Sequence, residues 1–189
     1  MSRRPLLVLA IGATLIAACG ADPAPSVPAG TYPGLRAGGL LRLEVETLAD
    51  DAVEPAALRT LLDEAGFTVA VERTFVGSAA VRSVTARIVQ FSSADGAARY
   101  LGWLRSHAAD LLGESERAQG IELPGGTEAV SFTAAPRGCC AKAMTTSLAA
   151  WQRGSKVFTV LAVGPAADEA GVADLARAFD GSAAAAERP

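Results

Sequence analysis

The chain carries the same order of local patterns twice. Alternating strand patterns flank a Gly-Ser turn and lead into an amphipathic helix, first over residues 67–112 and again over about residues 141–180. Strands joined by a tight turn pair as an antiparallel hairpin, and helices that follow such hairpins cover the sheet. The order therefore predicts an α+β fold, an antiparallel sheet covered by helices, and suggests pseudo-duplicated strand-strand-helix units. Residue identity between the two halves is slight, so the repeat concerns architecture alone.

Hydrophobic periodicity and turn residues place the elements along the chain. The predicted elements of the first half are a strand at 41–46, a helix capped by Asp50 or Asp51 and stopped by Gly66, strands at 67–75 and 81–91, and a helix from its cap at Ser92 or Ser93 to about Leu112. The predicted elements of the second half are a polar connection at 113–126, strands at 130–134, 141–152 and 156–163, and a helix at 168–180. The strand at 156–163 is apolar on both sides, which predicts a central position in the sheet.

Composition places the chain among single-domain globular proteins. Its 189 residues suffice for one medium domain, and the hydrophobic half of them consists mainly of Val, Leu and Ala. The 17 basic residues form no cluster and are outnumbered by 20 acidic ones, which excludes the electrostatic footprint of a nucleic-acid-binding protein. No motif indicates a cofactor.

The N-terminus has the pattern of a signal peptide. Two arginines precede an uncharged run from Pro5 to Ala18, which is short for a membrane-spanning helix of about 20 residues but fits a signal peptide. The sequence Ile16-Ala17-Ala18-Cys19 resembles the lipobox of bacterial lipoproteins. By that resemblance residues 1–18 are removed and the Cys19 thiol takes a diacylglyceryl group, whose two acyl chains attach a protein stably to a membrane.

Other interpretations of this segment stay open. An ordinary secretory signal with a chance cysteine and an uncleaved anchor are the alternatives to lipidation. The run from Ser2 to Leu7 also resembles the twin-arginine export pattern, although any signal peptide can carry two arginines there. Removal of Arg3 and Arg4 leaves 15 basic against 20 acidic side chains, so the anchored body has no attraction of its own to anionic lipid.

Proline and small residues dominate Gly20 to Gly39, which predicts an extended tether. At about 3.1 Å per residue, roughly fifteen tether residues would reach on the order of 45 Å from the membrane. The predicted organisation is a signal peptide at 1–18, the lipidated cysteine and tether at 19–39, a single α+β domain at 40–181 and a flexible tail at 182–189.

A resemblance to the small α+β lipoproteins of actinobacteria rests on three features. They are the lipobox, the proline-rich tether and the run FSSADGAARYL at 91–101 after a strand, with Arg153-Gly154 opening a late strand. Those lipoproteins are similar in layout to external sensor domains of receptor kinases. The resemblance brings no catalytic residue and implies an extracytoplasmic domain that lipid holds at the cell membrane.

Two adjacent cysteines, Cys139 and Cys140, are the most unusual candidate site. Neighbouring Cα atoms lie about 3.8 Å apart, less than the usual separation in a disulfide, so a bridge between them would be strained and easily reduced. With Cys19 lipidated the remaining cysteines are even in number, and a structural vicinal disulfide is the first interpretation. Free buried thiols are the second. A redox or metal site is the third, with Met144 and His107 as further ligands for Cu(I).

The other polar candidates favour structural roles. His107 could act as a general base oriented by Asp110, but no nucleophile accompanies it, and local pairing at a helix boundary is the simpler interpretation. Gly125-Gly126-Thr127 lacks the spacing and the lysine of a phosphate-binding loop and is predicted to be a turn. Three glutamates of the polar connection could bind a cation but are better explained by a solvated loop: Glu114, Glu116 and Glu122.

Trp103 and Trp151 could line a ligand groove, although core packing is the stronger expectation for each. Three functions remain: a non-enzymatic domain that binds or senses an apolar or envelope ligand, a subunit that holds a protein partner at the membrane, and a redox or metal-handling protein that uses Cys139 and Cys140. The first is preferred because no catalytic constellation is recognisable. A cleft larger than about 300 Å³ with an apolar lining would favour the first, and an exposed apolar patch would favour the second.

Overall fold

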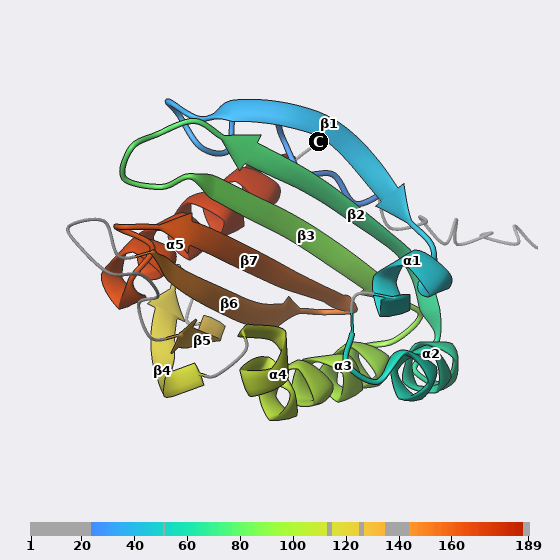
Figure 1. The fold of residues 1–189 in the computed structure, drawn as a ribbon. Coiled ribbons are helices and arrows are strands. Elements are labelled where there is room, and N and C mark those ends of the chain that lie inside the picture. The colour runs from blue at the N-terminus through green and yellow to red at the C-terminus, as the bar shows by residue number, and fades with distance from the viewer. Residues whose placement is uncertain (1–23, 51, 113–114, 125–126, 135–143, 187–189) are drawn as a thin grey trace, which may run out of the picture.

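A computed structural model describes residues 24–50, 52–112, 115–124, 127–134 and 144–186. Within these ranges the chain forms a seven-stranded sheet in which all neighbouring strands are antiparallel. Across the sheet the strands are β1 (Arg36–Leu43), β2 (Phe67–Val76), β3 (Ser83–Phe91), β7 (Lys156–Gly164), β6 (Thr145–Arg153), β5 (Thr127–Ala134) and β4 (Ser115–Leu123) (Figure 1). The predicted α+β fold is confirmed, and β7 occupies the expected central position.

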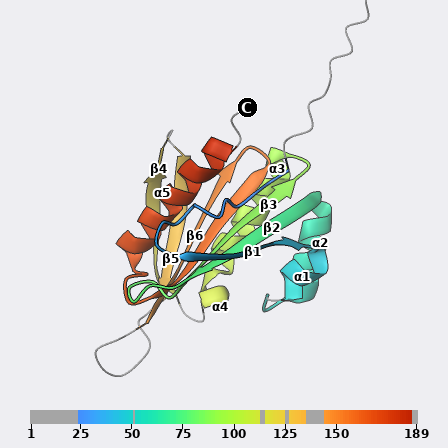
Figure 2. The same cartoon turned by 90° about the horizontal axis from the view of Figure 1, so that it is seen from above.

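Helices cover both faces of this sheet, as Figure 2 shows from above. The described helices are α1 (Val45–Asp50), α2 (Pro55–Glu64), α3 (Ala94–Ser106), α4 (Ala108–Leu112) and α5 (Glu169–Ala186). α5 packs on one face, whereas α1 to α4 pack on the other. None of the helices in the described part of the chain is long and apolar enough to cross a membrane.

Side chains of the central strands alternate between two hydrophobic cores. Val84 and Ile88 of β3 pack toward α5, whereas Val89 of the same strand packs toward α3. This is the two-residue period of a strand whose faces are both covered. The alternation decides which side chains of β3 and β7 face the helices α1 to α4, where the candidate site lies.

Local signals in the sequence fix several element ends. The Ser93 hydroxyl accepts a hydrogen bond from the Gly96 amide at 3.0 Å and caps α3 as predicted. Gly66 follows α2 with φ of 73°, a left-handed conformation in which glycine meets no Cβ penalty. Gly154 turns the chain between β6 and β7 with φ of 55°.

The repeated order of elements is present, but the two units are not related by symmetry. The hairpin β2-β3 leads into α3, and the hairpin β6-β7 leads into α5, with β3 and β7 paired at the centre. The two helices nevertheless lie on opposite faces of the sheet. The twofold axis that relates two neighbouring antiparallel strands is perpendicular to the sheet, so it would leave both helices on the same face. Because the helices lie on opposite faces, the two units share only the order of their elements.

The predicted tether is wrong for the described part of its range. Val27 is 0 % exposed and Tyr32 is 4 % exposed, and both belong to the core between the sheet and α5. The Thr31 hydroxyl lies 3.1 Å from that of Ser182 near the end of α5. Proline-rich composition pointed to an extended linker, but two apolar side chains suffice to dock this segment on the sheet.

Two boundaries near the start of the domain also differ from the prediction. β1 begins within the expected tether and ends at Leu43, so Val45 opens a helix and Leu41 is exposed. The single helix expected before Gly66 is divided into α1 and α2. Glu54, not Asp50 or Asp51, is the N-cap residue of α2, and Asp50 instead accepts a hydrogen bond from Arg59.

Two segments expected to be irregular are regular. The polar connection at 113–126 contains β4, which pairs with β5 at the edge of the sheet. The expected tail continues α5 to Ala186, and Ala183 is buried against the sheet. In both segments tertiary pairing or packing outweighs a weak local pattern.

Candidate functional site

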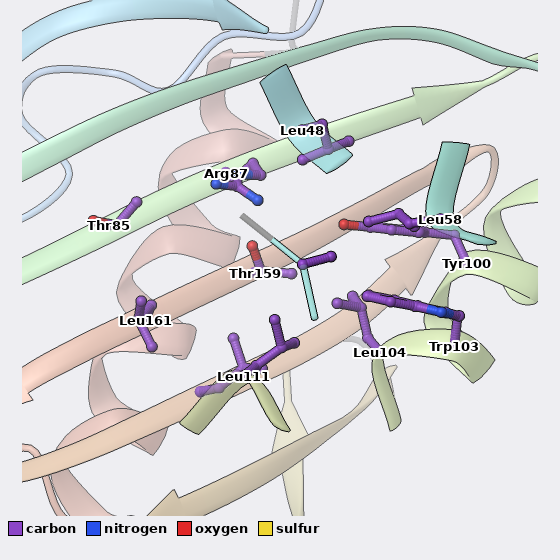
Figure 3. Close-up of a pocket in the computed structure, with 12 residues that line it drawn as sticks. Leu48, Leu58, Thr85, Arg87, Tyr100, Trp103, Leu104, Leu111, Thr159 and Leu161 are labelled. Carbon is purple, nitrogen blue, oxygen red and sulfur yellow. The ribbon is translucent and has the colours of Figure 1, made fainter. Parts of the chain in front are cut away.

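A cleft opens on the face of the sheet that α1 to α4 cover (Figure 3). Its volume is about 310 Å³, at the lower end of the range for small-molecule sites. β3, β6 and β7 form the floor, α1 and α2 stand on one side, and α3 and α4 stand on the other. The helices contribute mainly leucines to its walls: Leu48, Leu58, Leu104 and Leu111.

The floor mixes polar and apolar side chains. Thr85 and Arg87 come from β3, and Thr159 and Leu161 come from β7. These residues share one face because two positions separate the members of each pair. The cleft therefore offers hydroxyl and guanidinium donors at the bottom of an apolar enclosure.

Arg87 forms an ion pair with Glu72 of β2. Its Nε donates to Glu72 Oε2 at 2.8 Å, and the side chains of Arg87 and Glu72 are 23 % and 14 % exposed. The two residues occupy paired positions of the β2-β3 hairpin. A partly desolvated ion pair carries a stronger local field than an exposed one, because little water screens it.

Tyr100 of α3 brings its hydroxyl to the same place. Figure 3 shows this hydroxyl pointing into the cleft toward Arg87, with which it shares a hydrogen bond. Burial raises the pKa of the Tyr100 hydroxyl above its ordinary value, although the neighbouring Arg87 charge opposes this shift. At neutral pH the hydroxyl therefore stays protonated and takes part in hydrogen bonds without acting as a base.

Trp103 lines the cleft beside Tyr100, although core packing was the stronger expectation for this residue. Its ring lies parallel to that of Tyr100 with centroids 6.3 Å apart, and parallel to that of His107 with centroids 4.5 Å apart. The His107 Nδ1 lies 3.0 Å from the Trp103 carbonyl oxygen. His107 is the C-cap residue of α3, which confirms local pairing at a helix boundary, and its imidazole packs on the Trp103 ring.

Trp151, the other aromatic candidate, does not reach the cleft. It is fully buried on the opposite face of the sheet, where it stacks on Phe158 with centroids 5.5 Å apart. Its indole Nε1 donates to Asp180 of α5 at 3.1 Å, and Arg153 donates to the other carboxylate oxygen of Asp180. Trp151 thus holds α5 to the sheet and is excluded as a ligand contact.

Several candidate residues fall outside the described part of the chain. These are Cys19, Cys139 and Cys140, together with Gly125, Gly126, Glu114 and the side chain of Glu116. Glu122 is exposed on β4, Thr127 opens β5 and Met144 precedes β6. The described residues contain no group of three or more His, Cys, Asp or Glu side chains that could hold a metal ion.

Sequence analysis missed the polar floor of the cleft. Glu72 and Arg87 lie in the two strands of the predicted hairpin, where they pair with one another. The predicted turn at Gly77-Ser78 would instead place Glu72 opposite Ser83, so this pair was not available from the sequence. The role of Thr159 was not available either, because only the tertiary fold brings β7 beside β3 and lines the cleft with both strands.

Comparisons with known proteins give one solved structure. No family model matches the chain, and no curated protein matches it. The chain is similar to the extracellular domain of PknH from Mycobacterium tuberculosis, with 12 % sequence identity and a TM-score of 0.43. That similarity covers 78 % of this chain and 84 % of the other.

Proposed function

We propose that the protein is a non-enzymatic binding protein of the cell envelope, anchored to the membrane through Cys19. The cleft would take a small amphipathic ligand. Its apolar part would lie along the leucines of the walls, and a hydrogen-bond acceptor, most simply an anionic group, would meet Arg87 and Tyr100. The single observation that carries this proposal is an apolar cleft of about 310 Å³ whose floor holds Arg87, the partner of Glu72 in an ion pair.

The chemistry of the lining supports binding in preference to catalysis. Arginine remains protonated throughout the physiological pH range, and the pKa of Tyr100 is raised. The remaining polar residues of the lining are the two threonines, with no histidine, cysteine or lysine beside them to activate a hydroxyl. Such a set orients a ligand but supplies no nucleophile with a base.

The ligand site can be tested with 8-anilinonaphthalene-1-sulfonate, a fluorescent probe that joins aromatic rings to an anionic sulfonate. We expect saturable binding of one probe per folded protein. Leu161→Trp should abolish this binding, because the larger side chain fills the cleft from its floor. Val163→Trp is the matched control, since Val163 lies on the same strand and face, two residues beyond the lining.

Circular dichroism must show that both variants fold. Equal probe binding by the parent and by a folded Leu161→Trp variant would refute the cleft as the site. Arg87→Met separates the polar from the apolar part of recognition. We expect Arg87→Met to weaken the binding of the sulfonate probe. Native mass spectrometry of the same variant, purified from its own host, should still detect any ligand that binds mainly through the leucines.

The anchor is tested separately by Cys19→Ser. Two acyl chains hold a protein stably on a membrane, so loss of the thiol that accepts them should release the protein from the membrane fraction. The control is the parent protein, which should stay with the membranes after a high-salt wash. Unchanged retention of the variant would exclude the lipid anchor.

A further inference from the structure

The point at which the chain joins the domain lies beside an exposed apolar edge. Ala24 and Pro25 border a shallow groove together with Leu40 and Leu41 of β1. β1 forms one edge of the sheet, and its end nearest α1 is the end that this groove occupies (Figure 1). The entry of the chain and the leucines therefore occupy the same side of the molecule.

An arginine fixes the entering segment to this edge. The Nε of Arg73 donates to the Val27 carbonyl oxygen at 2.8 Å, and its Nη1 donates to the carbonyl oxygen of Gly38 in β1. Val27 is itself buried in the core. The segment thus leaves the domain in a set direction, three residues from a buried anchor point.

Very little chain separates this edge from Cys19. Only residues 20–23 lie between Cys19 and Ala24, and five fully extended Cα steps span at most about 17 Å. The predicted tether at residues 19–39, with a reach on the order of 45 Å, would have allowed more than twice that distance. A lipid on Cys19 would consequently hold the Ala24 side of the domain close to the bilayer.

The exposed leucines suit such a position. Leu40 is 42 % exposed and Leu41 is 55 % exposed, and they are adjacent members of the small set of exposed large apolar side chains in the described residues. Leu40 pairs with Arg73 and Leu41 with Glu72, so the two side chains leave the edge on opposite faces of the sheet. The neighbouring charges, Arg42 and Glu44, form an exposed ion pair that leaves no excess of either sign.

We propose that the β1 edge at Leu40 and Leu41 rests on the membrane surface, with both leucines in the boundary between headgroups and acyl chains. The proposal depends on the lipid anchor at Cys19 given under the proposed function. Contact is apolar and not electrostatic, because the adjacent ion pair is balanced. The anchor and this edge together would set the orientation of the domain, which a long flexible tether would leave free.

The test uses the full lipidated chain, purified from membranes and reconstituted into vesicles of dioleoyl phosphatidylcholine with or without brominated phosphatidylcholine. Bromine quenches tryptophan only at close range. In Leu41→Trp we expect a loss of fluorescence in brominated vesicles beyond that of the parent protein. Ala79→Trp is the matched control, because Ala79 is exposed in the turn at the other end of the β2-β3 hairpin, and it should keep the quenching of the parent.

Flotation of the same vesicles separates the two proposals. Failure of the parent to float would refute the anchor and remove the basis of the edge proposal. A floating Leu41→Trp variant with no added quenching would overturn the edge proposal while leaving the anchor intact. The proposal would also be overturned if brominated lipid did not quench the new tryptophan of Leu41→Trp and sedimentation showed that the protein is a dimer. That result would indicate that a second copy of the chain covers this edge.

Discussion

At the scale of single residues, two buried tyrosines illustrate opposite uses of a hydroxyl. Tyr100 shares its hydrogen bond with Arg87 at the floor of the cleft. The hydroxyl of Tyr32 is buried without a hydrogen-bond partner among the described residues, while its ring packs edge-on against Phe75 with centroids 4.8 Å apart. A buried hydroxyl that lacks a partner contributes nothing to offset its desolvation.

The two tyrosine-to-phenylalanine variants should therefore differ. Tyr100→Phe should lower the free energy of unfolding by about 1.5 kcal/mol at neutral pH, since it removes a hydrogen bond to a charged group. Tyr32→Phe should leave stability unchanged or raise it, because it removes only an unpaired polar atom. Urea unfolding of both variants beside the parent measures the difference. A loss of equal size in Tyr32→Phe would mean that its hydroxyl has a partner.

The pH dependence of stability gives a second test of the buried tyrosines. Burial raises the pKa of both tyrosines above the ordinary value of 10.0. The unfolded chain loses these protons near pH 10 while the folded chain keeps them, so stability is full below that pH and falls as the pH rises above it. Tyr32→Phe should make this alkaline loss shallower. Thermal unfolding at several pH values between about pH 9 and pH 11 measures this loss of stability. An equal loss in the parent and in Tyr32→Phe would contradict the raised pKa of Tyr32.

At the scale of elements, α3 depends on a close approach to the end of α2. A Cβ built on Gly96 would lie 2.0 Å from the carbonyl oxygen of Ala65, whereas a Cβ on Gly102 of the same helix would meet nothing within 4 Å. Gly96→Ala must push backbone apart, and overpacking of this kind costs about 1–3 kcal/mol. Gly102→Ala should instead stabilise the protein by about 0.5–1 kcal/mol, because alanine favours the helix.

These two substitutions are chemically identical, so helix propensity alone predicts the same sign for both. Thermal denaturation should show a lower midpoint for Gly96→Ala and a higher one for Gly102→Ala. Similar shifts in one direction would mean that α3 does not pack against α2 as described. The experiment thus tests the wall of the cleft without changing any residue that lines it.

Elements with strong local patterns were predictable from the sequence, and those that depend on partners were not. The hairpin strands β2 and β3 alternate clearly, and Ser93 caps α3 as its position indicates. β4 reads SERAQGIEL, which no local rule favours as a strand, and it forms because β5 offers a full set of partners. The cleft was beyond prediction for the same reason, since its floor and walls come from segments far apart in the chain.

At the scale of the whole molecule, the segment at 24–35 belongs to the domain although its composition is that of a linker. It crosses the face of the sheet that α5 covers, and its contacts join β1, β2 and α5. A segment that contributes to the core cannot act as a free spacer. Its docking also explains why the distance from Cys19 to the domain is set by residues 20–23 alone.

Removal of this segment should therefore destabilise the domain. Burial of an apolar side chain contributes about 1.5–3 kcal/mol, so loss of Val27 and Tyr32 should reduce the free energy of unfolding by about 4 kcal/mol, a large share of the 5–15 kcal/mol typical of a domain. A chain that begins at Leu35 should unfold at much lower urea concentration than one that begins at Ala24. Val27→Ala in the longer chain keeps the backbone in place and should lose about 2 kcal/mol. If both variants had urea midpoints equal to that of the longer parent chain, this segment would be a free tether, as its composition predicts.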